Sequence, residues 1–128
     1  MTPREVIGML AVTAATAGLV GCNTQQALSH PKIAATWNPS RGRALIGYYG
    51  CGSCHVIGGV EGANGRVGPP LTRYTRRYHQ IAGVLPNTPA NLVRWIMNPP
   101  KYVPGVDMPV LGIGVRGARD IAAYLYGQ

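Results

Sequence analysis

The chain has 128 residues, of which 46% are apolar, so it is long enough for one small domain with a packed core. Its 18 glycines and 11 prolines predict a loop-rich fold, and small loop-rich domains generally need a cross-link or a bound group for stability. The net charge of +8 favours partners with acidic surfaces, and nucleic acid is disfavoured because no recognised nucleic-acid-binding motif accompanies the basic residues.

The N-terminal segment has the pattern of a targeting sequence. Residues 6–20 are apolar or small apart from two threonines, and this run is short for a membrane span, which needs about 20 apolar residues. The sequence LVGC at residues 19–22 resembles a bacterial lipoprotein box, in which the cysteine is lipidated and becomes the first residue after cleavage. We therefore expect residues 1–21 to be a lipoprotein signal peptide. An ordinary cleaved signal and an uncleaved anchor helix are the alternatives.

Residues 22–40 are then a lipid anchor and tether, with Cys22 as the lipidated residue and the folded domain at residues 41–128. This places the domain on the periplasmic side of a bacterial membrane, inner or outer. Trp37 in the tether either packs on the domain or lies near the membrane interface.

Two helices are predicted in the first part of the domain. Residues 41–49 have Ser40 as a plausible N-cap, and Gly50 ends the helix. A second helix begins with Thr88 as N-cap and Pro89 in its first turn, and it ends before Pro99. The glycine-rich residues 56–85 between them are predicted to form a loop with one short turn.

A third helix is predicted at residues 116–126, where Ala118, Ile121, Ala122 and Leu125 have the spacing of one buried stripe. No side chain is available to cap its start, so we expect the first turn to fray. No strand is predicted anywhere. The chain is therefore predicted to be all-α, with three main helices and long loops.

The sequence CGSCH at residues 51–55 is the attachment pattern of a c-type haem. Cys51 and Cys54 would form thioether bonds to the haem vinyl groups, and His55 would be the proximal iron ligand. This assignment and Cys22 together account for all three cysteines. The rival interpretations are a thioredoxin-type dithiol, which needs a βαβ setting, part of a zinc site, and chance.

Met108 is the candidate for the sixth position of the iron. It lies in a loop between Pro104 and Pro109, and a thioether ligand stabilises ferrous iron and keeps oxygen and peroxide away. Met97 is the competing candidate, although a role as a core filler suits it better.

Taken in chain order, several stretches of the domain resemble class I cytochrome c. The matching elements span residues 41–126 and are Gly42 with Leu45 and Ile46, then residues 51–55, 68–71, 92–99, 104–109 and 120–125. The resemblance implies a small helical fold wrapped around one covalent haem c. Residues 81–89 are also similar to cytochrome c domains associated with haem–copper terminal oxidases.

The resemblance also implies roles for individual residues. The carbonyl of Pro69 accepts a hydrogen bond from the proximal imidazole, Leu71 packs on the haem, and Trp95 faces the haem on its methionine side. Gly42 faces Tyr124 where the first and last helices cross. Plain core packing is the alternative for Leu71, Trp95 and Tyr124.

Residues 73–78 are unusually basic for this family. They form a docking patch for acidic redox partners, bind the haem propionates, or make a solvated loop without a specific role. His30 and His79 are expected to have no role at the iron.

The leading hypothesis is a membrane-tethered electron carrier rather than an enzyme, with no small-molecule substrate and with respiratory-chain partners that include a haem–copper terminal oxidase as a candidate. The alternatives are a fixed subunit of a terminal oxidase or of a periplasmic dehydrogenase complex. A haem peroxidase or gas sensor is a further alternative, and it requires that Met108 leave the iron open.

Overall fold

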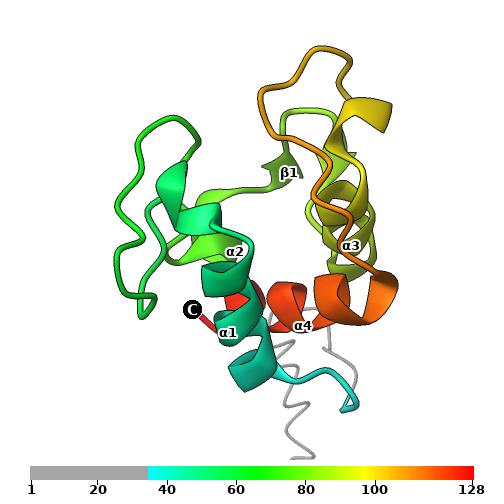
Figure 1. Ribbon diagram of the computed structural model, residues 1–128. Coiled ribbons are helices and arrows are strands. Elements are labelled where there is room, and N and C mark those ends of the chain that lie inside the picture. The colour runs from blue at the N-terminus through cyan, green and yellow to red at the C-terminus, as the bar shows by residue number, and fades with distance from the viewer. Residues whose placement is uncertain (1–34) are drawn as a thin grey trace, which may run out of the picture.

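The computed structural model describes residues 35–128 (Figure 1). The predictions of a signal peptide, of lipidation at Cys22 and of most of the tether, as well as His30, fall outside the described residues. Within this range the fold is mostly helical. It has four α-helices, α1 (Pro39–Tyr48), α2 (Tyr74–Arg77), α3 (Pro89–Met97) and α4 (Val115–Tyr126), and the short 3₁₀ turns Cys51–Ser53 and Pro99–Lys101. No helix among these residues has the length and hydrophobicity needed to cross a membrane.

Helix α1 begins two residues earlier than the sequence pattern indicates. Asn38 is the N-cap, because its side chain accepts a hydrogen bond from the backbone N–H of Arg41 at 2.9 Å, and Pro39 occupies the first turn. The prediction of Ser40 as N-cap was therefore wrong. Trp37 is half-buried and packs on the hydrophobic core, with the Arg119 guanidinium 6.0 Å from its ring centre. Trp37, just before α1, thus packs on the folded domain.

Helices α3 and α4 agree closely with the sequence prediction. Thr88 caps α3 by accepting the backbone N–H of Asn91 at 3.2 Å, and α3 ends at Met97 before Pro99. In α4, the predicted stripe is buried, and Gly114 at its start provides no side-chain cap. The lack of a cap was therefore predicted correctly.

The prediction that the domain contains no strand was wrong. Strands β1 (Gln80–Ile81) and β2 (Leu85–Pro86) form an antiparallel pair, with Ile81 opposite Leu85. The turn between them contains Ala82 and Gly83, both with positive φ, and the Val84 N–H donates to the Ile81 carbonyl at 3.0 Å. Strands of two residues are too short to show an alternating pattern in the sequence.

The core forms where α1 and α3 pack against α4. Ile46 of α1, Leu92 of α3 and Ala118 of α4 are among its buried residues, and Ala118 is completely inaccessible. Gly42 makes the crossing of α1 and α4 possible, because a Cβ atom there would lie 2.5 Å from the Asp120 carbonyl carbon. Gly42 therefore lies directly against the α4 backbone, and its expected contact with Tyr124 stays a prediction.

Candidate functional site

The CGSCH segment begins immediately after α1. Gly50 adopts a left-handed conformation with φ of 67°, which turns the chain into the 3₁₀ turn Cys51–Ser53. The Ser53 hydroxyl donates to the Gly50 carbonyl at 2.8 Å, and the His55 N–H donates to the Cys51 carbonyl at 3.0 Å. The turn therefore brings both cysteines and the histidine together on one compact loop at the end of a helix.

The imidazole of His55 has a defined tautomer. Its Nδ1 atom lies 2.7 Å from the Pro69 carbonyl oxygen, and a carbonyl only accepts, so Nδ1 carries the proton. In the neutral imidazole with this tautomer, Nε2 has the lone pair and can act as a metal ligand. The contact between His55 and Pro69 that the resemblance implied is thus present in the structure.

Gly68 is a site residue whose specific role was not evident from the sequence. A Cβ atom at this position would lie 2.6 Å from Nδ1 of His55 and closer still to Cε1. The Gly68 N–H donates to the Cys54 carbonyl at 2.8 Å, so the chain passes directly against the motif. The position of Gly68 just before Pro69 and Pro70 was the only sign of this close approach in the sequence.

Further backbone contacts fix the loop that follows the motif. The Gly65 N–H donates to the Gly52 carbonyl at 3.0 Å, and the Leu71 N–H donates to the Val56 carbonyl at 2.8 Å. A Cβ atom on Gly65 would lie 2.5 Å from the backbone nitrogen of Cys54. The glycines of this segment therefore let two stretches of backbone pack against each other around His55.

The two cysteines are free thiols, and both are partly buried. Burial raises the pKa of the Cys51 thiol, a backbone hydrogen bond opposes the rise, and charge on Cys54 adds to it. Redox-active dithiols have instead a lowered pKa, so this environment does not favour the thioredoxin-type interpretation. Among residues 35–128, no three His, Cys, Asp or Glu side chains gather in a group that could hold a metal ion.

The donor set fits a c-type haem. Two thiols lie three residues apart, and the adjacent imidazole has its Nε2 lone pair free because Nδ1 is bound to Pro69. Haem attachment through these three side chains requires no change in the His55 tautomer.

The other residues expected around a haem come from α3, from the loop that follows it and, for Leu71, from the loop after the CGSCH segment. The loop between α3 and α4, residues 98–114, lies across the molecule from the loops that follow α1 (Figure 1). Trp95 is buried, with its ring 6.5 Å from that of Tyr102, and Leu71 is partly buried against the core. Met97 and Met108 are both partly buried against the core, so packing does not distinguish between them as ligands.

Three arginines are exposed at α2. Arg73, Arg76 and Arg77 are exposed at α2, and none forms an ion pair with a carboxylate of residues 35–128. Arg73 has a positive φ of 55°, unusual for a residue other than glycine. His79 is exposed in the loop that follows.

No family model matches the chain, and no solved structure matches it. These comparisons therefore establish no family for the chain.

Proposed function

We propose that the protein is a class I cytochrome c that carries single electrons between respiratory-chain partners on the periplasmic side of a bacterial membrane. The observation that supports this most strongly is the hydrogen bond from His55 Nδ1 to the Pro69 carbonyl, 14 residues away. This bond leaves Nε2 free, as an axial ligand requires, and it involves the residue that the family resemblance indicates.

In this proposal Cys51 and Cys54 attach one haem covalently, and His55 is the proximal ligand. The haem supplies an iron that alternates between Fe(II) and Fe(III). The side chains of Leu71 and Trp95 contribute apolar surface to the haem environment, and Met108 fills the sixth position. A neutral thioether there stabilises ferrous iron, which suits an electron carrier and not an oxygen-activating enzyme.

The location is proposed from the lipoprotein box at residues 19–22. A lipid on Cys22 would hold the domain near the membrane and raise its effective concentration at membrane-bound partners. The exposed arginines of α2 would attract acidic docking surfaces, such as those of a terminal oxidase.

Haem attachment is tested first. The full chain is expressed in a bacterium that matures c-type cytochromes and is analysed by haem staining on a denaturing gel. We expect a stained band for the wild type, and we expect it to be lost when Cys51 and Cys54 are both changed to alanine. An unstained wild-type band would contradict the proposal.

The sixth ligand is tested with a matched pair of variants, Met108→Ala and Met97→Ala. We expect the oxidised wild type to show the far-red absorption band of a methionine–ferric bond, and we expect only Met108→Ala to abolish it. Loss of the band in Met97→Ala alone would move the ligand to α3. A wild type that lacks the band and binds carbon monoxide when reduced would favour a haem enzyme or gas sensor.

A further inference from the structure

The hydroxyl of Tyr78 forms a hydrogen bond next to the carbonyl that holds His55. It donates to the Pro70 carbonyl at 3.0 Å, and Pro70 directly follows Pro69. Tyr78 is the C-cap of α2, so it lies on a different element from the CGSCH motif. The contact connects α2 to the short segment against which the imidazole rests.

The peptide group between Pro70 and Leu71 is fixed at both ends. The Tyr78 hydroxyl donates to the Pro70 oxygen of this peptide, and the Leu71 N–H of the same peptide donates to the Val56 carbonyl at 2.8 Å. The pyrrolidine ring of Pro70 restricts φ to a narrow range, so little freedom remains between this peptide and the Pro69 carbonyl. The bond from Tyr78 is therefore one of two contacts that restrain the segment carrying the Pro69 carbonyl.

Tyr78 is also linked to the C-terminal helix α4 through Asn87. Its backbone carbonyl accepts from the Asn87 side-chain amide at 2.7 Å, and the Asn87 oxygen accepts from the Tyr126 hydroxyl of α4 at 2.7 Å. Its ring also packs on Tyr74, with the ring centres 5.6 Å apart. A continuous set of contacts thus leads from α4 through Tyr78 to the segment that orients His55.

We propose that Tyr78 is a positioning residue that sets the strength of the His55–Pro69 hydrogen bond and, through it, the reduction potential of the protein. The inference builds on the proposed function, since it requires a haem on His55. A well-directed acceptor at Nδ1 increases the basicity of the imidazole, which stabilises the ferric state and lowers the potential. Weakening that acceptor raises the potential.

The test compares Tyr78→Phe with Tyr124→Phe in the full haem-containing protein. The two variants are matched, because each loses one tyrosine hydroxyl that donates to a backbone carbonyl, that of Pro70 or that of Gly58. The potential is measured by redox titration, and solvent exchange of the His55 Nδ1 proton is measured by NMR on the reduced protein. We expect Tyr78→Phe to shift the potential upward and to speed the exchange, while Tyr124→Phe leaves both unchanged.

A Tyr78→Phe protein with the wild-type potential and exchange rate would overturn the role of Tyr78, and so would equal shifts in both variants. The two proposals fail in different ways. A wild type without covalent haem overturns the proposed function and this inference with it. A wild type with haem and a methionine ligand, but with no effect of Tyr78→Phe, overturns this inference alone.

Discussion

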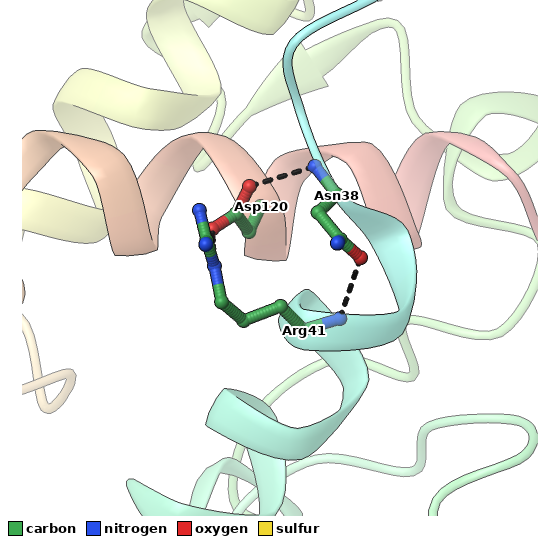
Figure 2. A network of polar contacts seen from close by, with 3 residues as sticks. All are labelled: Asn38, Arg41 and Asp120. Carbon is green, nitrogen blue, oxygen red and sulfur yellow. Dashed lines mark hydrogen bonds and ion pairs between the residues drawn. The ribbon is translucent and has the colours of Figure 1, made fainter.

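Asp120 accepts the backbone N–H of Asn38 at 2.7 Å, so a carboxylate in the middle of α4 binds the residue that caps α1 (Figure 2). The other carboxylate oxygen accepts from Nε of Arg41 at 2.5 Å. Asp120 is almost completely buried, whereas more than half of the Arg41 side chain is exposed. One buried side chain therefore connects the two helices that form the base of the fold.

We expect Asp120→Ala to destabilise the domain by about 2 to 3 kcal/mol, because it removes charge-assisted hydrogen bonds and leaves the Asn38 N–H without a partner. Asp120→Asn should cost less, since an amide oxygen can still accept from Asn38. Urea unfolding of both variants measures the difference. Equal losses would show that the charge, and not the bond to Asn38, carries the stabilisation.

The crossing of α1 and α4 predicts opposite effects for two glycines of the same helix. We expect Gly42→Ala to destabilise by about 1 to 3 kcal/mol, because its Cβ atom would collide with the Asp120 backbone and force the helices apart. Gly47→Ala is the control: apart from its chain neighbours and the backbone of α1 itself, no atom lies within 4 Å of the position that its Cβ atom would take, so it should stabilise α1 by about 0.5 to 1 kcal/mol. Thermal unfolding of the two variants measures both signs, and a loss of stability in Gly47→Ala would contradict the argument.

The helices and the His55 environment were predictable for different reasons. Thr88 with Pro89 marks a helix start by local chemistry, and the spacing of Ala118 to Leu125 marks a buried face, so α3 and α4 were found. Asn38 was missed as the cap of α1 because Ser40, two residues later, is an equally good cap by residue type. The tie between Asn38 and Asp120 spans 82 residues, and no local pattern reports it.

The donor residues of the candidate site were named from the sequence, whereas the residues that support them were not. CGSCH has a fixed spacing, and Pro69 entered through the family resemblance, so both were named from the sequence. Gly68 and Tyr78 act through contacts that exist only once the loop is folded against the motif. The sequence shows the glycines and tyrosines but not which backbone atoms they approach.

The position of Gly68 against the imidazole gives a prediction about haem attachment. In Gly68→Ala, the added Cβ atom would push the His55 ring away from the Pro69 carbonyl. We expect a lower yield of haem-containing protein and, in the protein that forms, loss of the normal axial spectrum. Val67→Ala serves as the control because Val67 is 73% exposed. Unchanged yield and spectrum in Gly68→Ala would mean that the loop can move to accept the Cβ atom without displacing the His55 ring.

The buried tyrosines predict a loss of stability in alkali. Burial raises the pKa of Tyr74 above its ordinary value of 10.0, and charges on Tyr126 and Tyr78 raise it further. The fold therefore favours the neutral form. The contribution of neutral Tyr74 to stability is complete below pH 10 and decreases at higher pH, by at most about 1.4 kcal/mol per pH unit.

Tyr74→Phe removes this dependence at one site. Because the Tyr74 hydroxyl forms no hydrogen bond with another residue of the 35–128 range, we expect little change at pH 7 and a smaller loss of stability than in the wild type at pH 11. Urea unfolding followed by far-ultraviolet circular dichroism at both pH values gives the comparison. Tyr48→Phe, at an exposed position, should behave as the wild type does. A parallel loss in Tyr74→Phe and the wild type would argue against burial of the Tyr74 side chain as the cause.

Under the proposed function, the exposed arginines of α2 predict a salt-dependent rate of electron transfer. We expect Arg76→Gln/Arg77→Gln to lower the second-order rate with an acidic redox partner by about three- to tenfold at low ionic strength, because steering depends on these charges. The difference from the wild type should disappear as added salt screens the charges. Arg43→Gln/Arg116→Gln is the matched control, since it removes the same charge from exposed positions on α1 and α4. Stopped-flow rates over a salt series separate the outcomes: equal effects of the two double variants would indicate a response to net charge, and no effect of either would remove α2 as a docking surface.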